Sequence, residues 1–444
     1  MKAIKTLSIA TLIGASAVYA QTADQLITME GITDTYVTNT TLSTYGWAHP
    51  VTTSGNSPDE AKYLCLTSGE GKSFTLTSDI SSSGNAFRVE TGSAWNAFAP
   101  ALYVYKNSTA TLSGWGSVSY LTNGPRAGLG LVVDEGASFT VDVNSEFAST
   151  KGFMYAEYGL CSRSDVYYGD SPYSAQFRGT VNVWCGIFNL RTTCEMKDGV
   201  PISPSLYQLI DTKGVLNIGS AANVVMNNVM LKGTINFVGK AESVSFTRMG
   251  PDNDLGALIV DSNSAVIGLY GENSISKNYT DNISFANSDS KLTFKVGGDA
   301  LNQTFFVESQ EIPVINAFGG ATMVIDATAE RNVDSPAQIA LAGIVSDTGV
   351  GTFNLEINGF ENDFVYFEEE YAVSSDGKIV LDSGLVVQLS GTNLNGDALA
   401  NDWAIENVDG KYFLQNSSVV PEAADIAVIF GAIAFAFVAY RRRK

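Results

Sequence analysis

Short segments in which apolar and polar residues alternate recur along most of the chain, and this alternation limits the folds that the chain can adopt. Because successive side chains of a β-strand point to opposite faces, period-two alternation of Thr, Val, Ile and Phe is typical of strands with one buried face. The sequence therefore predicts an all-β body. The clearest segments are Ser73–Thr77, Ser138–Val143, Thr180–Val183, Val215–Ile218, Thr234–Phe237, Ser243–Phe246, Lys291–Val296, Thr352–Ile357 and Lys378–Leu381.

The alternating segments are separated by turns, and most of them follow a glycine, a residue that permits the backbone conformations of tight turns. One turn and one strand recur every 19 to 40 residues or so. This spacing is compatible with the coils of a right-handed parallel β-helix, or solenoid, that carries insertions of variable length. A pair of β-sandwich domains is the alternative, because sandwiches also have short strands and frequent turns. The turn glycines are Gly71, Gly136, Gly179, Gly214, Gly233, Gly351 and Gly377.

Alternation also predicts which side chains form the core, with the Asn and Thr residues between them facing outward. Two stretches have helical features instead. Ser57-Pro58-Asp59-Glu60 resembles a capped helix start that runs into Tyr63–Cys65, and Asp334–Leu341 is similar but is expected to be a loop insertion. A helix at 57–65 would cover the open end of a β-helix. The predicted core residues are Phe139, Val141, Val181, Val183, Leu216, Ile218, Ile235 and Phe237.

The first 20 residues have the features of a secretory signal peptide. Lys2 and Lys5 precede a short apolar stretch, Leu7–Ala17, and Val18-Tyr19-Ala20 provides small residues where a signal peptidase cleaves. We therefore expect export, with the mature chain beginning near Gln21.

The last residues of the chain predict a membrane-spanning helix. The 18 residues from Ala423 to Tyr440 are almost all apolar and would rise about 27 Å as a helix, close to the thickness of the hydrocarbon core of a bilayer. The basic residues that follow should stay in the cytoplasm and leave the body outside. The span includes Ile426, Phe430, Gly431, Phe435 and Tyr440, and the cationic tail is Arg441, Arg442, Arg443 and Lys444.

The arrangement of this C-terminus resembles the PEP-CTERM sorting signal, also called the ice-binding-protein C-terminal domain. Val420, Pro421, Glu422 and Ala423 stand where that family has its Pro-Glu-Pro motif, and an apolar helix and an arginine cluster follow. Ala423 replaces the second proline of the motif. The resemblance implies processing by an exosortase, a membrane-embedded cysteine protease or transpeptidase of Gram-negative bacteria that make extracellular polysaccharide.

These features divide the chain into five parts. We expect a signal peptide at 1–20, an N-terminal cap region at 21–65 and a β-helical body at 66–415. A linker with the sorting motif follows at 416–422, and the membrane helix with its cationic tail occupies 423–444.

Charge and residue types exclude several function classes. A net charge of −20 opposes binding to nucleic acid, which depends on Lys and Arg contacts to phosphates. His49 is the only histidine, so catalytic triads and multi-histidine metal sites are not expected. Pairs of carboxylates such as those of glycosidases are still candidates for catalysis, but no pair in the sequence is distinguished from the others. We therefore expect no catalytic site, metal or cofactor. The candidate carboxylates are Asp134 with Glu135, Asp252 with Asp254, and the group Glu361, Asp363, Glu368, Glu369 and Glu370.

The cysteines and tryptophans suggest two further features. In an exported protein the four cysteines are candidates for disulfides, and Cys185 and Cys194, which flank one predicted strand, are a candidate pair; buried free thiols are the alternative. Trp95, Trp115 and Trp184 could form platforms on which sugars stack.

Together these observations predict an exported protein of the cell envelope or surface, anchored by one membrane span or processed by an exosortase, with a structural or adhesive role. A polysaccharide lyase or glycoside hydrolase on a β-helix is the alternative. The expected partners are signal peptidase, an exosortase-type enzyme and the membrane, with extracellular polysaccharide as a further candidate.

Overall fold

The computed structural model of the chain is nearly all strand in the part that it describes. The only helix there is a single 3-10 turn, Ser145–Phe147. The predicted all-β body is thus confirmed. The described residues are 27–28, 36–38, 47–48, 63–65, 71, 73–78, 87–90, 101–114, 118–122, 131–149, 152–157, 173–190, 196–197, 200–201, 207–239, 241–247, 257–270, 282–297, 303–304, 314–329, 339–341, 343–346 and 349–419.

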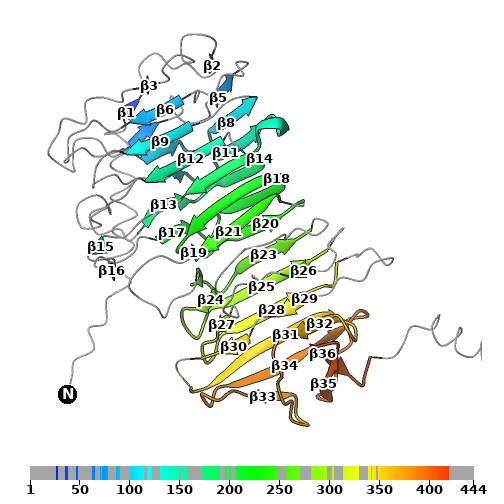
Figure 1. The fold of residues 1–444 in the computed structure, drawn as a ribbon. Helices are drawn as coiled ribbons and strands as arrows, with labels where there is room; N and C mark the ends of the chain where they lie inside the picture. Colours follow the sequence, from blue (N-terminus) through cyan, green and yellow to red (C-terminus); the bar gives the residue numbers. More distant parts are fainter. Residues whose placement is uncertain are drawn as a thin grey trace, which may run out of the picture.

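Two large sheets, built mostly from parallel strands, dominate the structure, and the strands follow one another down a single axis in chain order (Figure 1). In the first sheet every pairing is parallel, and its strands are two to five residues long. Its members are β1 (Ile27–Thr28), β4 (Tyr63–Cys65), β7 (Ala101–Val104), β10 (Leu131–Val133), β13 (Tyr173–Phe177), β17 (Tyr207–Ile210), β19 (Val229–Leu231), β22 (Leu258–Val260), β24 (Asn282–Phe285), β27 (Val314–Asn316) and β30 (Gly343–Val345).

The second sheet has one long series of parallel strands and a shorter parallel series beside it. Strands β14 and β18 are long enough to belong to both: β18 pairs with β20 through Val215–Ile218 and with β21 through Asn223–Asn227. The long series is β2 (Tyr36–Thr38), β5 (Ser73–Ser78), β8 (Thr109–Gly114), β11 (Ser138–Val143), β14 (Thr180–Leu190), β18 (Val215–Asn227), β20 (Thr234–Phe237), β23 (Ala265–Leu269), β25 (Lys291–Val296), β28 (Thr322–Asp326), β31 (Thr352–Phe360) and β34 (Val386–Asn393). The short series adds β3 (Trp47–Ala48), β6 (Phe87–Glu90), β9 (Val118–Thr122), β12 (Gly152–Glu157) and β21 (Ser243–Thr247).

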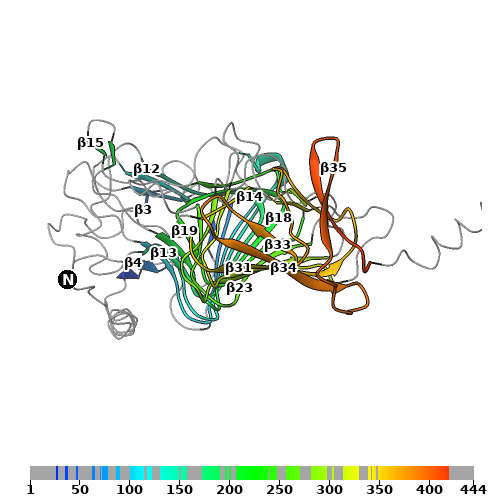
Figure 2. The ribbon, with the colours of Figure 1, turned by 90° about the horizontal axis from the view of Figure 1, so that it is seen from below.

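The chain alternates between the two sheets. From β17 onward the order is β17 in the first sheet, β18 in the second, β19 in the first, β20 and β21 in the second, and so on to β30 and β31. Register partners in neighbouring strands are therefore far apart in sequence, as with Asn182 and Asn217, 35 residues apart, and Asn217 and Asn236, 19 residues apart. Seen along the axis, the strands lie over one another around a common interior (Figure 2).

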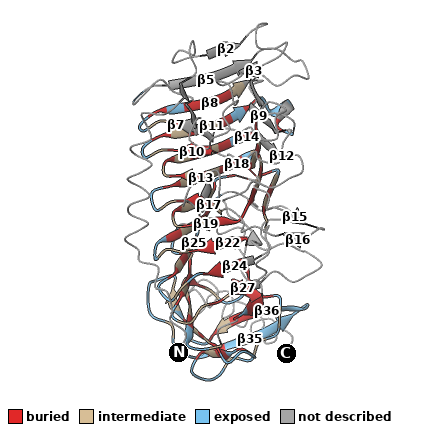
Figure 3. Ribbon diagram, turned by 90° about the vertical axis from the view of Figure 1, so that its left-hand side faces the viewer, coloured by how far each residue is buried: buried red, intermediate tan, exposed pale blue. Residues whose placement is uncertain are grey.

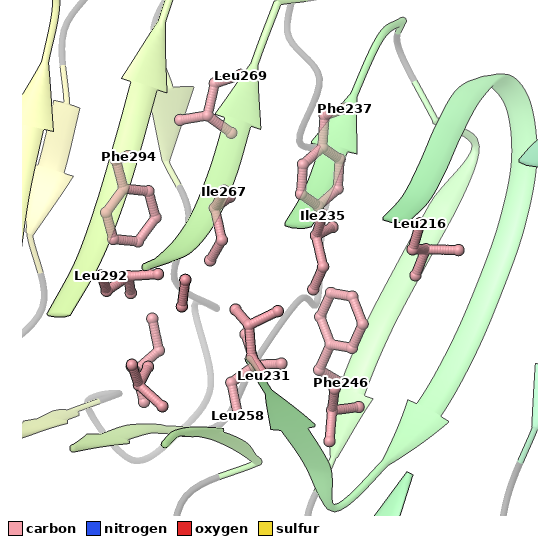
Figure 4. Close-up of a cluster of buried hydrophobic side chains, with 14 of the residues drawn as sticks. Leu216, Leu231, Ile235, Phe237, Phe246, Leu258, Ile267, Leu269, Leu292 and Phe294 are labelled. Atoms are coloured by element: carbon pink, nitrogen blue, oxygen red, sulfur yellow. The ribbon is translucent and has the colours of Figure 1, made fainter. Parts of the chain in front are cut away.

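That interior is a continuous apolar core, toward which buried residues of both sheets gather (Figure 3). All eight core residues predicted from alternation are fully buried. Leu216, Ile235 and Ile267 come from successive strands of the second sheet and point toward Leu231 and Leu258 of the first (Figure 4). In parallel register the inward-facing apolar side chains of one strand lie next to the inward-facing apolar side chains of the following strand, so they pack against each other. The core is therefore built in layers along the axis.

Antiparallel strands close the C-terminal end of the parallel stack. Strand β33 (Lys378–Val380) pairs antiparallel with β34, and β36 (Lys411–Asn416) pairs antiparallel with both β32 (Val365–Phe367) and β35 (Trp403–Val408). Trp403 is buried and packs edge-on against Phe360 of β31, with ring centroids 4.9 Å apart. Strand β35 itself is largely exposed (Figure 3). The remaining strands are β26 (Gln303–Thr304), β29 (Ile339–Leu341) and the hairpin β15 (Met196–Lys197) with β16 (Val200–Pro201).

Both helical features of the sequence end in strands rather than helices. Tyr63–Cys65 forms β4, parallel to β1 and β7, and residues 57–62 lie outside the described part. Ile339–Leu341 forms β29, buried between β26 and β32. In each described segment the residues pair with two parallel strands, a tertiary gain that local propensity does not include. Strands β1 to β4, within the predicted cap region 21–65, already belong to the two large sheets.

No helix in the described residues is long and apolar enough to cross a membrane. The predicted signal peptide, the sorting motif Val420–Ala423 and the span that ends at Tyr440 all lie outside those residues.

Candidate functional site

A row of uncharged polar side chains follows the outer surface of the second sheet. The side-chain amide of Asn182 donates to the Thr140 hydroxyl at 3.2 Å. The amide of Asn217 donates to Oδ1 of Asn182 at 2.8 Å, and the amide of Asn236 donates to Oδ1 of Asn217 at 2.9 Å. The Thr140 hydroxyl on β11 and the three amides on β14, β18 and β20 are each in register with the next. The outward orientation predicted for the Asn and Thr residues is thus observed, and their amides form a hydrogen-bonded ladder across four strands.

Three exposed side chains of apolar or aromatic character lie just beyond this amide ladder. Trp184 is 36% exposed, Val238 42% and Tyr270 37%. The Val238 amide donates to the Ile218 carbonyl and the Tyr270 amide to the Phe237 carbonyl, both at 2.9 Å, which places Val238 and Tyr270 immediately past the ends of β20 and β23. We call Trp184, Val238 and Tyr270 the exposed row.

Trp184 faces outward, as its alternation with the buried Val181 and Val183 requires, and it lies at a local irregularity in the strand pairing. In β14 the register passes from Val183 directly to Cys185, so Trp184 has no partner in β11 or β18. Such a bulge bends the strand locally. The neighbouring strand β18 has glycine at this corner: a Cβ on Gly219 would stand only 2.9 Å from the Trp184 backbone, so no larger residue would fit beneath the ring.

The same corner contains a hollow of about 560 Å³. Trp184, Gly219 and Val238 line it together with the polar residues Asp142, Ser145 and Ser220. Ser145 belongs to the 3-10 turn that follows β11, whereas Ser220 lies in β18 and Val238 directly follows β20. The hollow thus combines one aromatic ring, a carboxylate and two hydroxyls.

Cys185 lines this hollow as a buried, free thiol. Cys194, its candidate disulfide partner, lies outside the described residues, so the pairing stays a prediction. Burial, with a smaller contribution from the Asp142 carboxylate, raises the pKa of Cys185. The thiol therefore stays protonated and packs as a small apolar side chain.

The carboxylates Asp134 and Glu135, a candidate catalytic pair, form ion pairs with separate cations. Arg178 stands 3.5 Å from Asp134, and Lys213 stands 2.5 Å from Glu135. The hydrogen bond and the charge of Lys213 lower the pKa of Glu135, and Glu135 in turn raises the pKa of Lys213. These residues join neighbouring turns of the stack, which is a structural use of their charge.

The acidic stretch from Glu361 to Glu370 likewise has separate partners. Asp363 accepts a hydrogen bond from Gln415 at 2.6 Å, whereas Glu369 accepts one from the Tyr371 hydroxyl at 3.0 Å. The same hydroxyl accepts from the Ile344 amide at 2.7 Å. Burial raises the pKa of Tyr371, so this phenol is a neutral brace between β30 and the segment after β32.

Several residues singled out in the sequence cannot be placed. His49, Asp252, Asp254, Trp95 and Trp115 lie outside the residues whose side chains are described. Among the His, Cys, Asp and Glu side chains that are described, no group of three or more could hold a metal ion. Trp184 is the one candidate aromatic platform that the structure locates.

The sequence analysis missed Val238 and Tyr270. Each directly follows an inward-facing apolar residue, Phe237 or Leu269. An apolar or aromatic residue therefore stands where the alternation of apolar and polar residues would place a polar one. Two consecutive apolar residues at the end of a predicted strand could have indicated these exposed side chains, because the second residue must face outward or lie beyond the strand.

No protein-family model matches the chain, and searches of curated proteins and of solved structures also find no match.

Proposed function

We propose that this chain is an exported protein of the cell envelope or surface whose body is a right-handed parallel β-helix with a structural or adhesive role. The observation that carries the proposal is the amide ladder on a long stack of mostly parallel strands. A stack of this kind presents the same uncharged groups at regular intervals along its axis, which suits a surface that holds an extended partner or forms part of a matrix. Catalysis has no part in the proposal.

The β-helix is supported by the alternation of the chain between two parallel sheets. Parallel neighbours cannot be joined by tight hairpins, so each pairing requires the chain to cross to another sheet and return. Sandwich domains are built mainly from antiparallel strands, so they agree less well than a β-helix with the parallel pairing of these strands. Right-handed winding is favoured because parallel crossover connections are right-handed in nearly all proteins.

Export and surface location are supported by the ends of the sequence. Lys2 and Lys5 with Leu7–Ala17 direct the chain to the secretory pathway, and the C-terminus holds or releases the protein at the membrane. Asp425 stands at the outer edge of the apolar span, and a carboxylate inside hydrocarbon costs a few kcal/mol. Removal by an exosortase-type enzyme therefore fits the span better than permanent residence.

The processing of the tail tests this proposal. We expect mature protein from the native host to lack Ile426–Lys444, because Pro421-Glu422-Ala423 acts as the sorting motif. Intact-mass measurement checks the C-terminus, and the double variant Pro421→Ala, Glu422→Ala is the matched control, which should keep the tail. If most wild-type molecules retain a peptide with Arg441-Arg442-Arg443, the signal is a plain membrane anchor.

A further inference from the structure

We propose that the hollow at Trp184, together with Val238 and Tyr270 beside it, binds a neutral polysaccharide chain that lies along the strand stack. This inference rests on the proposed surface function and gives it a partner.

The exposed indole indicates the class of ligand. Trp184 lies on the same outer face of β14 as Asn182 of the amide ladder, and it is 36% exposed there. An indole is a large apolar surface with a polar N–H. A sugar ring has the complementary chemistry, since its C–H groups form apolar faces and its hydroxyls point outward around the rim.

Polar groups for those hydroxyls surround the ring. The Asp142 carboxylate accepts hydrogen bonds, and the Ser145 and Ser220 hydroxyls both donate and accept; all three line the hollow. A few polar groups placed around an apolar platform is the usual composition of a small-molecule site.

The spacing of the exposed row indicates a chain rather than a single sugar. Trp184, Gly219, Val238 and Tyr270 lie on or directly after the successive strands β14, β18, β20 and β23. Neighbouring strands are about 4.8 Å apart, so three spacings separate Trp184 from Tyr270 by about 14 Å. The surface between them has no large side chain at Gly219, and the Tyr270 ring lies over another glycine, Gly268.

The negative charge of the protein favours an uncharged polysaccharide over an anionic one. The protein has a net charge of −20. Among the described residues that line the hollow, the ionisable groups are the carboxylate of Asp142 and the protonated thiol of Cys185. An anionic polysaccharide would be repelled by both the local and the overall field.

The test is affinity electrophoresis of the mature protein in gels that contain laminarin, dextran or galactomannan, with alginate as the anionic counterpart. At least one neutral polymer should retard the wild type, and alginate should not. Trp184→Ala should weaken that binding about tenfold or more, as removal of a central aromatic anchor does. Tyr270→Ala should weaken it severalfold.

Val380→Ala is the matched control, because Val380 is 67% exposed on β33 at the far end of the stack; it should bind as the wild type does. Thermal midpoints of all variants report folding separately. The proposal is wrong if no neutral polymer retards the wild type, if Trp184→Ala binds equally well, or if alginate binds as tightly. Export and tail processing are measured by fractionation and mass, so the surface function can fail or stand independently of glycan binding.

Discussion

Replacing Phe188 by alanine is expected to lower the free energy of unfolding by about 3–5 kcal/mol, the usual range for loss of a buried ring. Phe188 is fully buried. Its ring stacks on Phe153 with centroids 5.5 Å apart and meets Phe177 edge-on at 6.1 Å. These three rings come from β14, β12 and β13, so their contacts join both large sheets.

Urea denaturation followed by tryptophan fluorescence measures this loss. Val380→Ala serves as the control, because truncation of an exposed side chain changes stability by about 0.5 kcal/mol or less. If the Phe188→Ala midpoint matches that of the control, the layered core is not what holds the stack together.

Replacing Gly214 by alanine is expected to destabilise the protein by about 3 kcal/mol, although only one methyl group is added. A Cβ at Gly214 would stand 2.0 Å from the Phe177 carbonyl oxygen of the preceding turn. That oxygen already accepts a hydrogen bond from the Asp211 amide at 2.9 Å, so it cannot move away without losing this bond. The loss comes from the close stacking of successive turns.

Gly410→Ala is the matched control for that experiment. Gly410 has a φ of +83° and nothing within 4 Å of the added Cβ. Alanine there meets only the strain of the left-handed region, about 1–2 kcal/mol. Equal denaturation midpoints for the two variants would contradict the close packing of turns at Gly214.

The alternation of residues was sufficient to predict the strands and their buried faces. Phe139 and Phe237, for example, are fully buried because inward and outward positions follow from period two alone. Local pattern could not place Tyr63–Cys65 or Ile339–Leu341, because their strand conformation depends on neighbours far away in the sequence. Propensity gives way to tertiary pairing at such positions.

The candidate site depends on which residues of neighbouring strands pair with one another, and this register could not be predicted from the sequence. Asn182, Asn217 and Asn236 could be predicted to face outward, but their hydrogen bonds require knowing that 35 and then 19 residues separate matching positions. Trp184 could be named as an aromatic platform, whereas the hollow around it needs the bulge in β14 and the glycine on β18. These features appear only when the strands are aligned.

Parallel register between successive strands is the central claim, and engineered disulfides test it directly. Asn217 and Asn236 are register partners in parallel strands, with Cα atoms about 4.8 Å apart and within reach of a disulfide. Val215 and Asn236 are offset by two residues, which places them about 7–8 Å apart. Peptide mass spectrometry after oxidation should find the cross-link in the double variant Asn217→Cys, Asn236→Cys and not in Val215→Cys, Asn236→Cys. An antiparallel pairing in which Leu216 lies opposite Ile235 would bring Val215 and Asn236 together, so a cross-link in the second variant alone would contradict the account.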